Sequence, residues 1–249
     1  MGLASLDPAV TLPSGARVRL GAHEWASGDV DPRGFELLER FDLVDGLPRW
    51  RWRIGGVVIE REVAMLPGRS CVAVVHRLVA GGPVRLELSA ACTWRDAHGE
   101  RRADGPVPQV EPVADGAVVE GAYRLAGPGW SPEGQWWLGV HHREEANRGL
   151  NADEDLWYAG RFVGELDRPG DTVAVRAWAG RLDEEPPASR RSWQRRGSAT
   201  GGWWRRRSRR TRSRRRSRWP PTRSWCVPTR RRSTWSPGTR GSGRGRGTR

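Results

Sequence analysis

The chain has 249 residues, enough for one large domain or two small ones. Its formal net charge is +14, from 43 basic and 29 acidic side chains, and every basic residue is Arg, which indicates a GC-rich gene rather than a phosphate-binding surface. Residues 1–185 hold all 29 acidic side chains and 21 Arg, a net charge of −8, whereas residues 186–249 hold 22 Arg and no acid. The two parts therefore need separate interpretation.

Cysteine usage and hydropathy exclude several classes of protein. Cys71, Cys92 and Cys226 form no Cys-x-x-Cys pair, so neither a disulfide framework nor a zinc site is indicated. The first residues lack the basic and long apolar regions of a signal peptide, and no run of about 18 apolar residues indicates a membrane span. We expect a cytoplasmic chain without cofactor, metal or membrane partner.

The predicted elements are β-strands. From about Arg17 to Trp178, apolar and polar residues alternate with a period of two between Gly, Pro and Asp-Gly turns. Gly55-Gly56 predicts a hairpin whose two turn residues both take a positive φ. Gly34–Phe41 predicts about one helical turn. The remaining strands are expected at Trp50–Ile54, Val57–Val63, Cys71–Leu78, Val84–Leu88, Ala117–Leu125, Gln135–His142, Arg161–Leu166 and Thr172–Trp178.

Many short strands separated by Gly-rich turns favour an all-β fold, an antiparallel β-sandwich, over a parallel sheet. Residues 183–249 differ in composition: after Glu185 there is no Leu, Ile, Phe, Met or Tyr, and six Trp stand among Arg, Ser, Thr, Pro and Gly. Such a segment buries too little apolar surface to offset its ordering entropy. We therefore expect a disordered, Arg-rich segment over residues 183–249.

Several segments of the β-rich part resemble the N-terminal domain of bacterial and archaeal glycogen-debranching enzymes, the amylo-α-1,6-glucosidase family. Their order and spacing carry the resemblance more than any one of them does. The segments are Gly2–Leu6, Glu24-Trp25, Gly34–Phe41, Leu47–Trp52, Ile59–Val63, Trp94–Gly99, Asn151–Tyr158 and Gly160–Phe162.

The resemblance implies a β-sandwich of the supersandwich type over residues 1–182. In the family this domain precedes an (α/α)6 barrel, whose paired carboxylates hydrolyse α-1,6 branch points. The implied partners are glycogen or a related α-glucan, reached through the parent enzyme, and the barrel itself.

The chain departs from the family pattern at both ends. It begins at the Gly-Leu-Ala-Ser-Leu equivalent, where the family has a preceding Gly-rich stretch, and it ends without a barrel. We therefore expect a truncated, non-catalytic N-terminal domain that is inactive alone. A stand-alone α-glucan-binding module is one alternative. The other is an Arg-rich nucleic-acid-binding protein, since Arg with interleaved Trp suits phosphate contacts and base stacking.

The genetic code offers a different explanation of the Arg-rich segment. When the third base of each codon is read with the first two of the next, Trp203-Trp204 becomes Val and Trp193-Gln194 becomes Ala. Residues 233–243 then permit Asp-Val-Val-Ala-Gly-Tyr-Pro-Trp-Phe-Gly, which resembles the segment that opens the family's catalytic barrel. We interpret the segment as frameshifted, so that any affinity for nucleic acid is non-specific.

The densest polar cluster of the β-rich part is Trp94, Arg95, Asp96 and His98. A loop of this composition either hydrogen-bonds sugar hydroxyls or faces the missing active site, or it is a solvated loop after the strand Val84–Ala90. These four residues are our candidate carbohydrate-binding residues, and no catalytic or metal-binding residue is predicted.

Three further patterns have two interpretations each. His141-His142 lies in a strand, where adjacent side chains point to opposite faces, so a shared metal is not expected. Residues 153–155 (Asp-Glu-Asp) either bind a cation or glycan, or form a turn or helix cap. Tryptophans of the β-rich part either stack on glucose rings or belong to the core; these are Trp50, Trp52, Trp94, Trp136, Trp137 and Trp157.

The nucleotide sequence from codon 180 onward tests the frameshift interpretation. We expect the shifted frame to run on into an (α/α)6 barrel. A verified, unbroken frame that encodes the Arg-rich segment would overturn the interpretation and favour the nucleic-acid-binding alternative.

Overall fold

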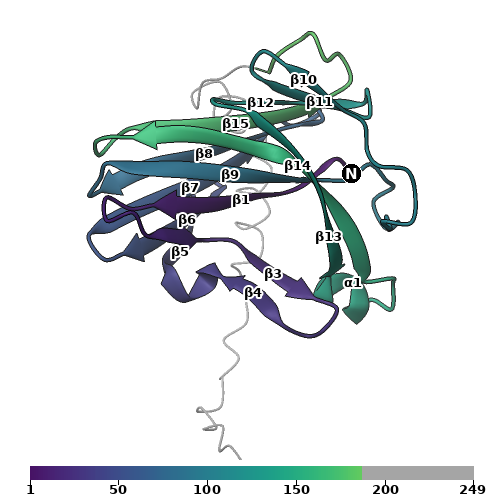
Figure 1. Cartoon of the computed structure of the whole chain (residues 1–249), viewed down its shortest axis with the longest axis horizontal. Coiled ribbons are helices and arrows are strands. Elements are labelled where there is room, and N and C mark those ends of the chain that lie inside the picture. The colour runs from purple at the N-terminus through teal and green to yellow at the C-terminus, as the bar shows by residue number, and fades with distance from the viewer. Residues whose placement is uncertain (187–249) are drawn as a thin grey trace, which may run out of the picture. The chain divides into compact units, whose positions relative to one another are not determined.

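The computed structural model describes residues 1–186. These residues form two antiparallel β-sheets that pack face to face, as Figure 1 shows, and so confirm the all-β sandwich. Most of the Arg-rich segment, residues 187–249, lies outside the described residues. Its expected disorder and its frameshift therefore stay predictions.

Within residues 1–186, the first sheet has seven strands in the order β2-β1-β9-β14-β13-β3-β4. Their bounds are β1 (Leu3–Thr11), β2 (Arg17–Arg19), β3 (Ala22–Trp25), β4 (Val30–Arg33), β9 (Val84–Cys92), β13 (Ser131–His141) and β14 (Asp153–Leu166).

In the same residues the second sheet has eight strands in the order β10-β11-β12-β15-β8-β7-β6-β5. Their bounds are β5 (Leu38–Val44), β6 (Leu47–Ile54), β7 (Val57–Met65), β8 (Cys71–Ala80), β10 (Val110–Val113), β11 (Gly116–Val119), β12 (Tyr123–Ala126) and β15 (Thr172–Ala179). The described part also has a 3₁₀-helix, η1 (Gly34–Leu37), and an α-helix, α1 (Arg143–Asn147). No helix in it is long and apolar enough to cross a membrane.

The main core lies between the two sheets. Because side chains alternate between the faces of a strand, Leu86 and Leu88 of β9 point inward, while Glu87 between them pairs with Arg17 on the other face. From the opposite sheet, Ile59 and Leu78 meet them in the same fully buried cluster. Burial of this apolar area is the main source of stability for the sandwich.

The predicted hairpin at Gly55-Gly56 is confirmed, with one correction to its turn. Ile54 of β6 pairs with Val57 of β7, so the loop has two residues. Only Gly55 takes a positive φ, of 57°, and Gly56 does not. This is the pattern of a type II′ turn, in which the first central residue alone requires the left-handed region.

The single strand predicted over Ala117–Leu125 is wrong. This stretch forms the end of β11, a turn and the start of β12, and Val119 pairs with Tyr123 across the turn. Glu120 and Gly121 both have positive φ values, 54° and 58°, which reverse the chain. The apolar alternation on either side of the turn concealed this reversal from the sequence pattern.

The helical turn predicted within Gly34–Phe41 is shorter than that range. Only Gly34–Leu37 is helical, and β5 begins at Leu38. A side chain at position 34 is excluded, because a Cβ there would lie 2.1 Å from the carbonyl oxygen of Leu20.

A histidine occupies the core without a hydrogen bond. His76 of β8 is fully buried, and neither ring nitrogen has a partner among the described residues. Arg61, opposite it on β7, lies over the ring of Trp50 with its Cζ 5.4 Å from the ring centroid. Burial, and then the charge of Arg61, hold the pKa of His76 well below its ordinary value. His76 is therefore neutral in the folded state.

We expect His76 to make the domain less stable in acid. Unfolded His76 takes up a proton near pH 6.5 while folded His76 does not, so the free energy of unfolding falls by up to about 1.4 kcal/mol for each pH unit below that value. His76→Leu should flatten this slope, measured by urea denaturation between about pH 7 and pH 5. The same substitution at His98, whose side chain is 64% exposed, is the control. An unchanged slope in His76→Leu would contradict this account.

Candidate functional site

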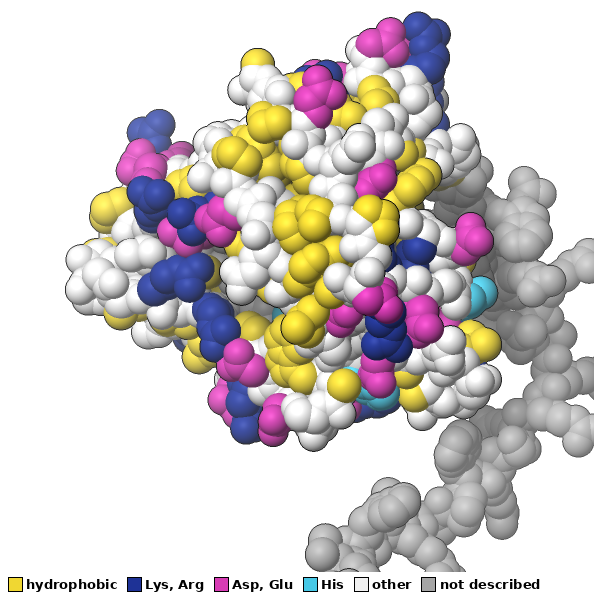
Figure 2. Space-filling view, turned by 45° about the vertical axis from the view of Figure 1, so that its right-hand side comes forward, with side chains coloured by type: hydrophobic (Ala, Val, Ile, Leu, Met, Phe, Trp, Pro, Cys, Tyr) yellow, Lys and Arg dark blue, Asp and Glu magenta, His cyan; other side chains and the backbone are white. Residues whose placement is uncertain are grey.

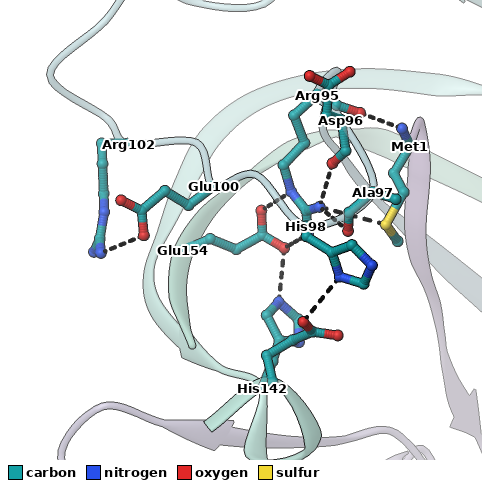
Figure 3. A network of polar contacts seen from close by, with 10 residues as sticks. Met1, Arg95, Asp96, Ala97, His98, Glu100, Arg102, His142 and Glu154 are labelled. Atoms are coloured by element: carbon teal, nitrogen blue, oxygen red, sulfur yellow. Dashed lines mark hydrogen bonds and ion pairs between the residues drawn. The ribbon is translucent and has the colours of Figure 1, made fainter. Parts of the chain in front are cut away.

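A network of ion pairs joins the loop after β9 to the facing ends of β13 and β14 (Figure 3). Arg95 donates two hydrogen bonds to the Glu154 carboxylate, from Nε to Oε2 and from Nη2 to Oε1, each 2.5 Å long. His142 Nε2 lies 2.7 Å from the same Oε1 atom. Both oxygens of the only glutamate that is fully buried among the described residues are thus occupied.

The network keeps Glu154 ionised. Burial alone raises the pKa of this carboxyl, but hydrogen bonds from His142 and Arg95 outweigh burial and leave the pKa below its ordinary value. The same hydrogen bond to Glu154 raises the pKa of Arg95. A buried charge of this kind is stable only because its partners are also fixed.

Arg95 and His98 lie close together, but the hydrogen bonds of the Arg95 guanidinium go to other groups of the protein. Its Nη1 donates to the carbonyl oxygens of Asp96 and Ala97, at 2.8 and 3.0 Å, so all three guanidinium nitrogens hold the fold. His98 Nδ1 lies 3.2 Å from Oε2 of Glu145 in α1. Both residues line a cavity of about 350 Å³ between this loop, α1 and the start of β14.

Trp94 and Asp96 do not line that cavity. Trp94 is 45% exposed, and its ring lies against Tyr123 with 5.8 Å between the ring centroids. Asp96 is exposed. The four candidate residues are thus neighbours in the loop without sharing one pocket, and their role in binding stays a prediction.

Residues 153–155 are not the turn or helix cap that the sequence suggested. All three lie in β14, and each carboxylate has its own set of partners. Asp153 Oδ1 lies 2.6 Å from Nδ1 of His141, and Glu154 binds Arg95 and His142. The two histidines therefore face separate carboxylates.

Asp155 completes this set of contacts. Its oxygens accept hydrogen bonds from the main-chain N–H of Ala103, at 2.8 Å, and of Gly139, at 2.7 Å. The start of β14 thus anchors the 95–108 loop on one side and β13 on the other. Among residues 1–186, no group of three or more His, Cys, Asp or Glu side chains is arranged to hold a metal ion.

The tryptophans divide between core and surface by strand alternation. Trp136 of β13 and Trp157 of β14 are directly opposite and pack edge to face in the core, 5.2 Å apart. Trp137 points to the other face, where its ring lies 5.5 Å from Tyr158. Trp52 is buried in the core, and Trp50 is half-buried beside Phe41.

Trp137 and Tyr158 belong to a cavity of about 330 Å³ on the outer face of the seven-stranded sheet. We call it the aromatic groove; Asp7, His23, Trp25, Trp137, Tyr158 and Arg161 are among its lining residues. Of these, the sequence analysis named only Trp137 as a candidate for stacking on a sugar ring. The others come from three strands, β1, β3 and β14, which are separated in the chain, so no local pattern grouped them. The adjacent pair Trp136-Trp137 was the available signal, because one of two neighbouring strand residues must face outward.

Fold and site together define an antiparallel β-sandwich domain with two features, an ion-pair network at one end and an aromatic groove on one outer face. A family model described as "Glycogen debranching enzyme N terminal" matches residues 1–174. The chain belongs to this family, which confirms the resemblance seen in the sequence. The search of curated proteins found no match. The boundary predicted at residue 182 stays a prediction.

We expect Glu154→Gln to destabilise the domain strongly. The substitution keeps the shape of the side chain but leaves Arg95, whose side chain is 10% exposed, without its charged partner. Breaking such a buried pair costs about 3 kcal/mol in the free energy of unfolding. Glu165→Gln is the matched control, because that side chain is 58% exposed and 3.9 Å from Arg85. Equal denaturation midpoints for the two variants would refute the anchoring role.

Proposed function

We propose that residues 1–182 act in the cytoplasm as the non-catalytic N-terminal domain of a glycogen debranching enzyme, in the breakdown of glycogen or a related α-glucan. Membership of the family supports the assignment to this enzyme class. The internal use of the buried carboxylates supports the non-catalytic role, and this is the observation that carries the proposal.

Glycoside hydrolysis needs one carboxyl that holds a proton at neutral pH and a second placed across the scissile bond. Glu154 does not meet the first requirement, since its pKa is lowered and both its oxygens accept hydrogen bonds. Asp155 uses its oxygens for two main-chain N–H groups. The carboxylates with the greatest burial thus serve the fold, and we assign the α-1,6 hydrolysis to a separate (α/α)6 barrel.

The surface supports a role as a docking domain. Figure 2 shows hydrophobic side chains gathered down the middle of one face, with acidic and basic side chains next to one another around them. A face of this composition is typical of one that packs against another domain. We propose that the domain packs on the barrel and helps to shape its α-glucan cleft.

Nucleic acid is not the proposed partner of the described residues. Residues 1–185 have a net charge of −8, and on the face shown in Figure 2 their Arg side chains stand beside acidic ones. Binding to phosphates needs clustered positive charge. Contact with nucleic acid is therefore proposed only as a non-specific property of the Arg-rich segment.

The purified chain should release no glucose from a branched limit dextrin. The physical reason is the absence of a protonated carboxyl from the buried network around Glu154. A glucose assay under conditions in which a debranching enzyme with its barrel is active provides the measurement and the positive control. Glucose release above the level of a heat-denatured sample would overturn the non-catalytic assignment.

A further inference from the structure

We propose that the aromatic groove binds a linear α-glucan on the outer face of the seven-stranded sheet. The groove lies on the middle strands β1, β9, β14 and β13 and extends over β2, β3 and β4 at the two edges. The class of ligand, a neutral saccharide, follows from the groove itself. The α-linkage rests on the proposed function.

The aromatic part of the groove offers ring faces to a sugar. Trp137 and Tyr158 lie 5.5 Å apart with 32° between their planes, so the two rings pack on each other as a tilted pair in which Trp137 is half-buried and Tyr158 is buried. His23 meets Trp137 edge to face at 5.2 Å and lies 5.9 Å from Trp25, which extends the surface onto β3. A pyranose ring has an apolar C–H face that packs on such a surface, as apolar groups pack on aromatic rings elsewhere.

The polar part of the groove favours an uncharged ligand. Its acidic and basic side chains have partners: Asp7 with His23, Glu133 with Arg161 at 3.0 Å, Arg19 with Asp31 at 2.8 Å, and Arg17 with Glu87, which lies outside the groove lining. A phosphate or a carboxylate ligand would have to compete with these pairs. The hydroxyl groups of a neutral ligand can hydrogen-bond to these side chains without breaking the ion pairs, because a paired carboxylate keeps free lone pairs and a paired guanidinium keeps free N–H groups.

The base of the groove carries two hydroxyl groups. Tyr158 is 8% exposed; its hydroxyl lies 3.4 Å from Ser89 Oγ, longer than an ordinary O–H···O hydrogen bond, and also hydrogen-bonds with Glu133. A ligand hydroxyl would share these contacts, since a hydroxyl group both donates and accepts. The volume of about 330 Å³ is within the range of roughly 300–1,000 Å³ that is usual for small-molecule sites.

The alternative saccharide site, the loop from Trp94 to His98, has fewer side-chain groups placed to contact a ligand. Arg95 is held by Glu154 and two main-chain carbonyls, and Trp94 stands outside the nearby cavity. The aromatic groove combines ring faces and hydrogen-bonding groups in one place. The two sites therefore make opposite predictions for matched tryptophan variants.

Calorimetric titration of the full chain with maltoheptaose tests the proposal. We expect saturable binding that Trp137→Ala weakens about tenfold or more, as truncation of a central aromatic contact does. Trp94→Ala is the matched control and should bind as the unaltered chain does. No binding by the unaltered chain, or equal affinity in Trp137→Ala, would overturn the proposal, as would a loss of binding confined to Trp94→Ala.

The ring of Trp137 packs on the small cluster of Ala91, Val140 and Leu156, so Trp137→Ala could lose binding because it misfolds. A second variant distinguishes this outcome from the loss of a ligand contact. Tyr158→Phe removes only the hydroxyl, and we expect it to weaken binding several-fold without a change in thermal midpoint. Unchanged affinity in this variant would count against the groove. Failure of these titrations leaves the non-catalytic assignment intact, because the limit-dextrin assay tests that assignment separately.

Discussion

The antiparallel pairing of β13 with β14 fixes what each face of the seven-stranded sheet carries. Successive side chains of a strand point to opposite faces, so this one ladder supplies aromatic rings to both. Trp136 and Trp157 enter the core, and Trp137 and Tyr158 line the outer groove. A shift of one residue in the register of β14 would move Trp157 to the outer face and Tyr158 into the core. The correct register is therefore a condition for the core and for the groove together.

The carboxylates at the start of β14 help to hold that register. Glu154 joins the strand to Arg95 in the loop after β9, and Asp155 joins it to the main chain of Gly139 in β13. Buried charges of this kind add little net stability when well paired but are costly to misplace. A slipped register would leave a buried carboxylate without partners, which is a strong penalty against alternative pairings.

The sequence predicted the fold class well because alternation and glycine turns are local signals. It located the strands from Trp50 to Leu88 and the strand that begins at Thr172, but it missed the reversal at Glu120-Gly121. For residues 153–155 it offered a cation or glycan site, or a turn or helix cap, since three acidic residues in a row are typical of exposed loops. Their partners, among them Arg95, Gly139 and His142, lie elsewhere in the chain, and only tertiary structure shows them.

The candidate site shows that a polar stretch of sequence does not distinguish side chains that bind a ligand from side chains that hold the fold together. Arg95 stands in the most polar stretch of the β-rich part, yet each of its guanidinium nitrogens already donates to the protein. A ligand that competed for Arg95 would leave the buried Glu154 with His142 as its remaining partner, which costs more free energy than a hydrogen bond to a sugar hydroxyl supplies. The ring faces of Trp137 and Tyr158 require no such exchange. The saccharide site that we propose on the sheet face would therefore form contacts without breaking an ion pair of the folded structure.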